Sequence, residues 1–406
     1  MKILRLSSKE IQKLYDRYYY NKKRVTEKVR RIVDDVRENG DRALIRYTRK
    51  FDKVKLSPKE LKVSANEINA AYQNIDTDFI TSLKAIMANI EKFHRKQLPR
   101  PWKTKDADGI QLGEIYRPIE TVGIYVPAGT APLVSSVYMS VLPAKIAGVK
   151  KIILVTPPAK DGRVDPHILA VANLLKVDEV YKAGGAQAIA ALAFGTKTIP
   201  KVDKIVGPGN DYVTEAKRQV YGYVDIDMLA GPSEVVILAN QFSDKEYVVQ
   251  DLQAQAEHLK GLAVLVTTSK KFARAMRKEM QKGYIVLAKN LEQAAEVINR
   301  IAPEHLEVLI KRPNRILKLI NNAGAVFIGP YSPVCIGDYV AGPSHVLPTG
   351  GTARFFSGLS VRSFLKSTHT IAYSRKALEK EKKAIEKMTK IEGLSRHLES
   401  FRARFT

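Results

Sequence analysis

Four of the seven histidines stand near residues with which they could share chemistry. His258 follows Gln255 by three positions on a helix predicted at residues 245–259. Residues three apart lie on one face of a helix, so both side chains could reach one metal ion. A Gln and a His at this spacing are more often solvated or core residues, and the pair alone does not decide between the two interpretations.

Two further sets of residues combine a carboxylate with an imidazole. Glu304 and His305 are adjacent at a predicted helix boundary, and these residue types suit proton transfer near neutral pH. Asp338 and His345 bracket a predicted loop with the sequence Ala-Gly-Pro-Ser, and binding sites are often built on such irregular backbone. A Glu-His dipeptide is common, so this one does not by itself indicate catalysis.

Strands and helices alternate along most of the chain after a helical start. Residues 1–98 show a helical pattern, with helices expected at 25–38 and 77–97, and a strand is expected at 113–127. Further strands are predicted at 151–156, 180–182, 204–206, 262–267 and 325–328, and further helices at 136–146, 167–175, 186–194, 211–220, 245–259, 271–281 and 291–301. Repeated βα units of this length predict an α/β fold with mostly parallel sheets covered by helices.

Two glycine-rich loops are predicted at the carboxyl ends of these strands, where parallel sheets bind their ligands. They span residues 183–187 and 207–210. Neither matches a full dinucleotide fingerprint, because the run that begins at Gly207 lacks the third glycine. Glycine beside a helix start still lets backbone N–H groups approach a phosphate, so nucleotide binding and ordinary tight turns both remain open.

Composition limits the class of protein. A chain of 406 residues with 45% hydrophobic residues can bury two substantial cores. The single cysteine, Cys335, excludes an internal disulfide framework and a thiolate metal cluster, which favours a reducing compartment. The N-terminus lacks the apolar core of a signal peptide, and no apolar run is long enough to cross a bilayer. We therefore expect a soluble, cytoplasmic protein that does not enter a membrane.

The net charge of +25 comes from 67 Lys and Arg against 42 Asp and Glu, and such an excess can bind nucleic acid or steer anions. The basic residues are spread through mixed-charge helical surroundings, and no zinc-finger, basic-zipper or single-strand-binding pattern is present. Solvated helix faces are therefore favoured over a nucleic-acid site. The tail at 375–405 is charged and helical with a narrow apolar stripe, and we expect it to pack on another surface.

Seven sequence motifs, spread over the second half of the chain and part of the first, follow one another in a recognisable order. They are Gly-Gly-Ala-Gln-Ala-Ile-Ala-Ala-Leu-Ala (184–193), Gly-Pro-Gly-Asn-Asp-Tyr-Val-Thr-Glu-Ala-Lys-Arg (207–218), Ala-Gly-Pro-Ser-Glu-Val (230–235), Gln-Ala-Glu-His (255–258), Ala-Pro-Glu-His-Leu-Glu (302–307), Gly-Asp-Tyr-Val-Ala-Gly-Pro-Ser-His-Val-Leu-Pro-Thr (337–349) and Glu-Gly-Leu-Ser-Arg-His (392–397). Together they resemble the histidinol dehydrogenase family. The resemblance implies two incomplete Rossmann-like domains with small helical N- and C-terminal segments, which agrees with the predicted alternation.

The same resemblance implies a division of the chain. We expect an N-terminal helical segment at 1–20 and a first, discontinuous Rossmann-like domain at 21–122 and 234–355 that carries the metal and catalytic residues. A second Rossmann-like domain at 123–233 would carry the NAD loops, and a C-terminal dimerisation tail would span 356–406.

The resemblance also implies the ligands. One Zn²⁺ per subunit would be held by Gln255, His258, Asp338 and, across a homodimer interface, His397 of the partner subunit. One carboxylate among neutral ligands would leave the ion positively charged and Lewis acidic. The substrate L-histidinol would contact the metal ligands together with Ser233, His305, His345 and Glu392, the last also from across the interface. Tyr125, Gln187 and Asn210 match the family's NAD contacts.

By the same resemblance, His305 takes the alcohol proton while a hydride passes to NAD⁺, and Glu304 activates the water that adds to the bound aldehyde. A second NAD⁺ then oxidises the hydrate to L-histidine in the last steps of histidine biosynthesis. A Glu-His pair suits this chemistry because each oxidation releases a proton.

Two features depart from the family or invite another interpretation. Ser344 stands where Asn is more often expected, and Cys335 lies three residues before Asp338, although a lone cysteine is more often a small apolar residue than a nucleophile. One alternative is a paralogous zinc- and NAD-dependent dehydrogenase of another small polar alcohol, which Glu392 disfavours because it suits the cationic amine of histidinol. A basic nucleic-acid-binding protein on an old enzyme scaffold is a more distant alternative.

Overall fold

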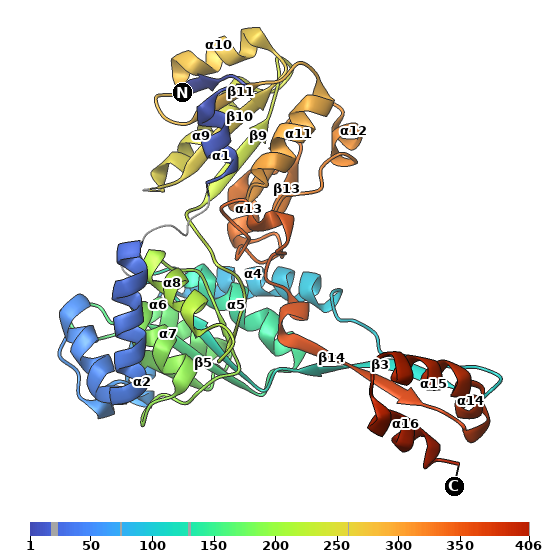
Figure 1. The fold of residues 1–406 in the computed structure, drawn as a ribbon. Helices are drawn as coiled ribbons and strands as arrows, with labels where there is room; N and C mark the ends of the chain where they lie inside the picture. Colours follow the sequence, from blue (N-terminus) through green and yellow to red (C-terminus); the bar gives the residue numbers. More distant parts are fainter. Residues whose placement is uncertain (18–22, 74, 129–130, 259, 406) are drawn as a thin grey trace. The chain divides into compact units, whose positions relative to one another are not determined.

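A computed structural model describes residues 1–17, 23–73, 75–128, 131–258 and 260–405. The chain divides into two compact units. The larger unit comprises residues 1–97 and 119–364, and the smaller comprises residues 98–118 and 365–406. The larger unit contains two parallel sheets, of six and five strands, and the smaller unit contains a three-stranded antiparallel sheet (Figure 1).

The six-stranded sheet is entirely parallel. Its strands, in spatial order, are β1 (Lys2–Leu4), β11 (Tyr284–Leu287), β10 (Leu262–Thr267), β9 (Glu234–Leu238), β12 (His305–Val308) and β13 (Ala325–Ile328). Strands β9 and β10 are almost entirely aliphatic because both of their faces are covered. Val236 and Leu238 point into a core shared with α1 (Lys9–Tyr15) and α11 (Leu291–Ile301). Val235 and Ile237 point into a core shared with α9 (Lys245–Glu257) and α10 (Lys270–Glu279) on the opposite face.

Two short helices complete this part of the larger unit. They are α12 (Pro313–Leu317), between β12 and β13, and α13 (Val334–Tyr339), which follows β13. The second of these positions Asp338, because the helix begins at Val334 and the carboxylate lies in its last turn.

The five-stranded sheet is also entirely parallel. Its order is β6 (Glu179–Lys182), β5 (Lys151–Thr156), β4 (Thr121–Tyr125), β7 (Lys204–Val206) and β8 (Asp225–Ile226). The helices α2 (Lys23–Phe51), α7 (Gly185–Phe194) and α8 (Asp211–Val220) pack together over one face around a large aliphatic core (Figure 1). The remaining helices are α3 (Ala65–Tyr72), α4 (Thr77–Arg95), α5 (Val134–Ala147) and α6 (Pro166–Leu174), of which α4 and α6 pack on α5. Three short 3₁₀ helices lie at Pro58–Glu60, Thr352–Arg354 and Val361–Phe364.

The smaller unit joins two stretches that are far apart in the sequence. β14 (Leu365–Ala372) pairs along its whole length with β3 (Gln111–Pro118), which pairs in turn with β2 (Trp102–Lys105). The tail then forms α14 (Arg375–Lys380), α15 (Lys382–Ile391) and α16 (Ser395–Arg402) (Figure 1). The prediction of a helical tail is confirmed.

The predicted α/β class with parallel sheets is confirmed, and several predicted elements need correction. The strand expected at 113–127 is two strands, β3 and β4, which belong to different sheets. The helix expected to end at residue 38 continues to Phe51 after a kink at Gly40, where φ is 51° and only glycine is comfortable. The N-terminal segment begins with a strand, β1, before the short helix α1. The division at 1–20, 21–122 with 234–355, 123–233 and 356–406 stays a prediction.

Candidate active site

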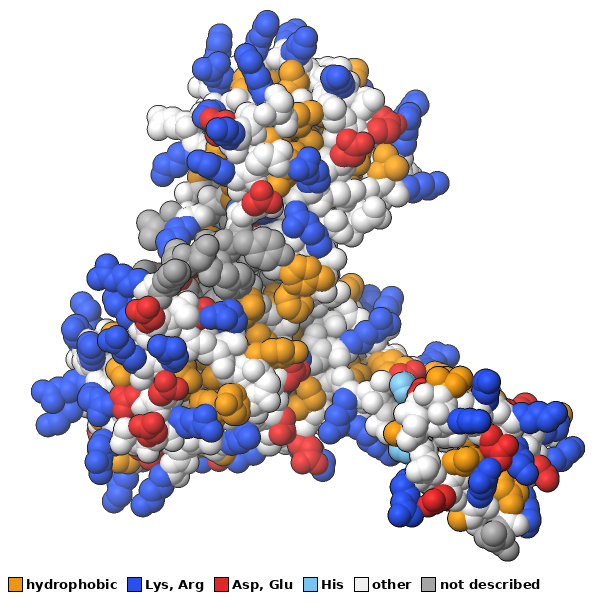
Figure 2. All heavy atoms as spheres, in the orientation of Figure 1, with side chains coloured by type: hydrophobic (Ala, Val, Ile, Leu, Met, Phe, Trp, Pro, Cys, Tyr) orange, Lys and Arg blue, Asp and Glu red, His pale blue; other side chains and the backbone are white. Residues whose placement is uncertain are grey.

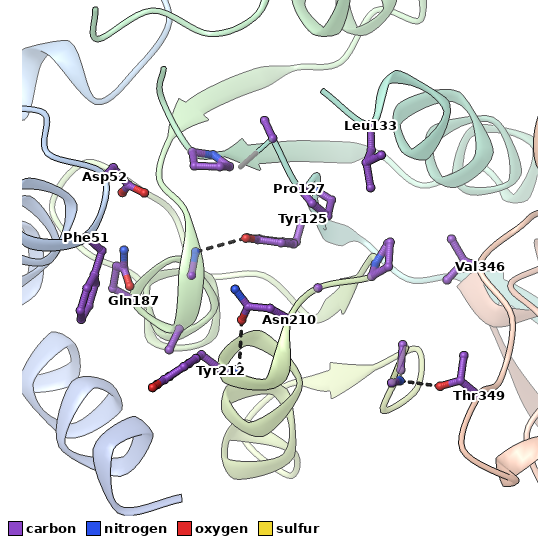
Figure 3. Close-up of a pocket in the computed structure, with 18 of the residues that line it drawn as sticks. Phe51, Asp52, Tyr125, Pro127, Leu133, Gln187, Asn210, Tyr212, Val346 and Thr349 are labelled. Carbon is purple, nitrogen blue, oxygen red and sulfur yellow. Dashed lines mark hydrogen bonds between the residues drawn. The ribbon is translucent and has the colours of Figure 1, made fainter. Parts of the chain in front are cut away.

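The larger unit contains a cavity of about 1160 Å³, which exceeds the roughly 300–1,000 Å³ of most small-molecule sites. Its lining includes loops at the carboxyl ends of strands of the five-stranded sheet (Figure 3), together with Ser233 and Glu304, which directly precede strands β9 and β12 of the six-stranded sheet. Among the residues singled out from the sequence, the cavity is lined by Tyr125, Gln187, Asn210, Ser233, His258, Glu304 and His345. The space can therefore hold a dinucleotide beside a small substrate.

The glycine loop after β7 lies against the end of β4. A Cβ at Gly207 would stand 2.1 Å from the carbonyl oxygen of Tyr125, and φ at Gly207 is +118°, so only glycine fits. At the end of this loop, the side chain of Asn210 caps α8 by accepting hydrogen bonds from the N–H groups of Tyr212 and Val213. This loop thus lines the cavity with tightly placed backbone.

Tyr125 and Gln187 offer polar groups to the same cavity. The Tyr125 hydroxyl accepts a hydrogen bond from the N–H of Gly185 at 3.2 Å, and burial raises the pKa of Tyr125 to about 12, so the hydroxyl keeps its own proton to donate. Gln187 is 1% exposed, and neither its amide nitrogen nor its amide oxygen has a hydrogen-bond partner among the described residues. Such an amide needs a polar ligand to satisfy it, and a dinucleotide supplies one.

Glu304 and His305 are both held by the backbone of one residue, Glu234. The N–H of Glu234 donates to Oε2 of Glu304 at 2.8 Å, and Nδ1 of His305 is 2.9 Å from the carbonyl oxygen of Glu234. A carbonyl only accepts, so Nδ1 carries the proton and Nε2 carries the lone pair. Nε2 is buried and has no hydrogen-bond partner in the described part of the chain. The imidazole is therefore oriented as a base with its accepting nitrogen free.

The electrostatics of this pair suit proton transfer. Burial raises the pKa of Glu304 well above its ordinary value, and the nearby carboxylate of Glu234 raises it further. Burial lowers the pKa of His305, which keeps the ring neutral near pH 7, although the Asp338 carboxylate opposes this shift. The Oδ1 atom of Asp338 lies 3.7 Å from Nε2 of His305. A buried carboxyl group with a raised pKa thus stands beside a neutral imidazole, an arrangement common in active sites.

The side chain of Glu234 is itself clamped by Arg17. The guanidinium donates to both carboxylate oxygens at 2.6 Å, and Glu234 is 4% exposed. The sequence analysis missed both residues. Glu234 lies inside the Ala-Gly-Pro-Ser-Glu-Val motif, which was the available signal, but its partner stands 217 positions away.

A pair of neighbouring carboxyl groups, on Glu307 and Asp251, was also missed. Glu307, two positions after His305, is fully buried, and burial together with the neighbouring carboxylate of Asp251 raises its pKa to about 9. Burial also raises the pKa of Asp251, which lies on α9. Glu307 accepts the backbone N–H of Val334, the first residue of α13, at 3.1 Å. The pair therefore links β12, α9 and α13, the elements that carry His305, Gln255 and Asp338.

The predicted metal ligands of the larger unit are only partly gathered. Gln255 is buried and donates from Nε2 to the carbonyl oxygen of Ser233 at 2.8 Å, while the Ser233 hydroxyl lies 3.4 Å from its Oε1. His258 is the C-cap of α9 and has extended backbone, so the expected helix ends two residues earlier, at Glu257, and the same-face argument is wrong. Leu259, the last residue of that expected helix, lies outside the described residues. No group of three or more His, Cys, Asp and Glu side chains that could hold a metal occurs within the described ranges.

The loop expected between Asp338 and His345 is present at residues 340–344, although Asp338 itself lies in the last turn of α13. The carbonyl oxygen of Asp338 is 3.0 Å from Nδ1 of His345, whose Nε2 is 3.4 Å from the Ser136 hydroxyl. Burial lowers the pKa of His345, which favours the neutral ring. Cys335 is exposed, and its thiol pKa is raised by desolvation and nearby carboxylates, the opposite of what an activated nucleophile needs.

Glu392 and His397 belong to the smaller unit and are both exposed. Glu392 ends α15, and His397 lies in the first turn of α16. The exposed side chains on this unit include Ile371, Met388 and Ile391, which are 73%, 52% and 66% exposed.

Parallel sheets with a glycine-lined cavity at their strand ends, and a buried carboxyl beside a neutral imidazole, define a nucleotide-dependent enzyme that moves protons. Comparison with known proteins makes the class specific. The family model described as histidinol dehydrogenase matches residues 16–405. The histidinol dehydrogenase of Listeria monocytogenes is 48% identical over 404 residues, which covers 95% of this chain and 94% of the relative.

Two further similarities agree. The histidinol dehydrogenase of Clostridium acetobutylicum is 47% identical, with 98% of this chain and 96% of the relative covered. The crystal structure of histidinol dehydrogenase from Elizabethkingia anophelis is 37% identical and superposes with a TM-score of 0.93, covering 100% of this chain and 97% of that one. The chain belongs to the histidinol dehydrogenase family. The predictions of an NAD-dependent dehydrogenase and of a role in histidine biosynthesis are confirmed.

Proposed function

We propose that the protein oxidises L-histidinol through histidinal to L-histidine at the cavity of the larger unit, using two NAD⁺. The observation that carries this proposal is the hydrogen bond from Nδ1 of His305 to the carbonyl oxygen of Glu234, which leaves Nε2 free as an acceptor, while Glu304 lies on the Nδ1 side of the ring. Names of relatives at 47% to 48% identity support the substrate. Across both steps two hydrides leave the substrate, one oxygen enters from water and three protons are released.

The two catalytic residues have separate tasks. His305 accepts the alcohol proton on Nε2 as the first hydride passes to NAD⁺. Glu304 removes a proton from the water that adds to the aldehyde, and its raised pKa makes it a stronger base than an exposed carboxylate. The second hydride then leaves from the hydrate. Ser233 and His345 line the same cavity and contact the substrate.

NAD⁺ binds along Tyr125, Gln187 and Asn210. The two unpartnered amide atoms of Gln187 support this assignment, because a buried amide is normally satisfied by a ligand or a neighbour. The glycine loop at residues 207–209 supports it too. Pro208 and Gly209 line the cavity, and glycine beside a helix start lets backbone N–H groups approach a phosphate.

A zinc ion fits the chemistry of the predicted donors, which are the amide oxygen of Gln255, the imidazole of His258 and the carboxylate of Asp338, with His397 of the partner subunit completing the set. When bound, the ion supplies Lewis acidity and a fixed point for the substrate. Such sharing requires a homodimer in which Glu392 also crosses the interface. The exposed apolar side chains of the smaller unit support such an interface.

We place the protein in the cytoplasm, where enzymes of amino-acid biosynthesis work and where a lone free thiol is stable. In the described residues, no helix combines the length and the apolar character needed to span a bilayer. Figure 2 shows Lys and Arg side chains scattered over the visible face and mixed with acidic ones, which favours solvated faces over a nucleic-acid site.

The test is the amount of NADH formed per L-histidinol consumed by zinc-loaded protein, before and after chelation. Two NADH per substrate, lost on chelation and restored by zinc, is the expected result. One NADH per substrate, or none, would direct attention to the paralogous dehydrogenase of another small polar alcohol. Unchanged activity after complete removal of zinc, verified by metal analysis, would refute the zinc assignment.

A further inference from the structure

The cavity extends beyond the residues assigned above, to the end of α2. Phe51 and Asp52 line it there, and three cations of the same helix, Lys28, Arg31 and Lys50, also line the cavity. Figure 3 shows Phe51, Asp52 and Gln187 on one side of the cavity and Val346 and Thr349 on the other. Val346 follows His345, so Asp52 lies at the end away from the His345 loop.

Asp52 is held in an unfavourable environment. Its Oδ2 is buried and has no hydrogen-bond partner among the described residues. Desolvation raises the pKa of Asp52 to about 6, and no cation contributes an opposing shift. The residue also follows the last turn of α2, where the helix dipole disfavours a negative charge, and Lys53 beyond it has φ of 63°. A ligand that donates hydrogen bonds would relieve this desolvation.

The orientation of the cofactor identifies that ligand. The nicotinamide ring must lie where hydride leaves the substrate, at the end of the cavity lined by Glu304 and His345. The adenosine half then extends toward Phe51 and Asp52. Phe51 is 48% exposed and stacks on Tyr47 with ring centroids 5.7 Å apart, so an aromatic face is available to a purine.

We propose that the Asp52 carboxylate accepts a hydrogen bond from the 2′-hydroxyl of the adenosine ribose of NAD⁺ and thereby rejects NADP⁺. A 2′-phosphate would bring two negative charges against a desolvated carboxylate, whereas a hydroxyl supplies the donor that Oδ2 lacks. Lys28, Arg31 and Lys50 also line the cavity and can pair with phosphate oxygens of the cofactor. This assignment rests on the proposed use of NAD⁺ at this cavity.

The test compares wild type with Asp52→Asn, using L-histidinol and three cofactors. These are NAD⁺, NADP⁺ and NAD⁺ without the 2′-hydroxyl of its adenosine ribose. We expect Asp52→Asn to raise the Kd for NAD⁺, measured by fluorescence titration without substrate, by about tenfold, and to lower kcat/KM for NAD⁺ by the same factor through KM, since one charge-assisted hydrogen bond is lost. Removal of the 2′-hydroxyl should lower kcat/KM by about tenfold for wild type and only slightly for the variant. The preference for NAD⁺ over NADP⁺ should narrow by about tenfold or more.

Asp34→Asn is the matched control, because it removes an exposed carboxylate from the same helix, away from the cavity. Its cofactor constants should equal those of wild type. An Asp52→Asn variant that saturates at wild-type kcat with NAD⁺ shows that the fold is intact. If that variant keeps the wild-type preference among the three cofactors, the assignment of Asp52 is wrong, whereas wild type that fails to oxidise L-histidinol refutes the proposed function instead.

Discussion

The two ends of the cavity treat their polar groups in opposite ways. At the catalytic end, the backbone of Glu234 holds both Glu304 and His305, and Arg17 holds Glu234 in turn. At the cofactor end, both amide atoms of Gln187 and one oxygen of Asp52 are buried without partners in the described structure. The groups proposed to move protons are thus oriented within the protein itself, whereas the atoms of Gln187 and Asp52 proposed to recognise the cofactor have no partner among its described residues.

The largest effect is expected from removing the base at the catalytic end. His305→Gln should lower kcat for L-histidinol oxidation by about 10²–10⁴-fold, because Nε2 is the proposed acceptor of the alcohol proton. The affinity for NAD⁺, measured by fluorescence titration, should change less than about threefold if the two ends act separately. A variant with nearly wild-type kcat would show that His305 is not the base.

A smaller effect, on stability as well as rate, is expected from the clamp behind that base. Arg17→Met leaves the buried Glu234 carboxylate without its partner, which should cost about 3 kcal/mol of unfolding free energy. Denaturant unfolding and kcat are the measurements. The double variant Arg17→Met with Glu234→Leu removes both charges, so much of the stability should return. The equally exposed partners Lys245 and Glu279 offer a surface control, since breaking their ion pair should have little effect.

The smallest effect is expected at the cofactor end, where a substitution should raise the free energy of unfolding instead of lowering it. Without cofactor, Asp52→Asn should stabilise the protein by about 1 kcal/mol at pH 8, because an ionised carboxylate with no partner is removed. The pKa of Asp52 in the fold, about 6, lies above its ordinary 3.8, so the wild-type penalty is present at high pH. It disappears as the pH falls through 6 toward 4.

The melting temperatures of wild type and Asp52→Asn at pH 8 and pH 4.5 test this prediction. The variant should melt at the higher temperature at pH 8, and the difference should shrink at pH 4.5. Excess NAD⁺ should also narrow the difference at pH 8, because it stabilises wild type more than the variant. A variant that is less stable than wild type at pH 8 without cofactor would show that Asp52 already has a partner in the protein.

The sequence predicted the elements whose residues follow a simple period. Helix α8 and strands β5, β7 and β10 were predicted at their observed bounds, since buried parallel strands are continuous apolar runs. Strand β12 was missed because its sequence, His-Leu-Glu-Val, carries two ionisable residues. Those residues are buried only because Glu234 and Asp251 approach them from elsewhere in the fold. Local patterns contain no such information.

The residues of the candidate site likewise fall into those that a local motif predicted and those that only the fold reveals. Glu304, His305 and the NAD contacts were expected because their motifs resemble a known family, and seven of the predicted residues line one cavity. Arg17 and Asp52 were not predicted from the sequence, since each stands in a local sequence without a recognisable motif. Their importance comes from a partner far along the chain in one case and from burial without a partner in the other.

The strand pairing has a consequence for the time course of synthesis. Lys2 pairs with Tyr284 in the six-stranded sheet, and Gly113 pairs with Thr370 in the antiparallel sheet. At about 5–20 residues per second on the ribosome, strands β1 and β3 wait roughly tens of seconds for their partners to emerge. Closure of such long loops favours slow folding that is completed only after translation. The nascent chain therefore exposes unpaired strand edges during elongation, and it is then that chaperones would be needed most.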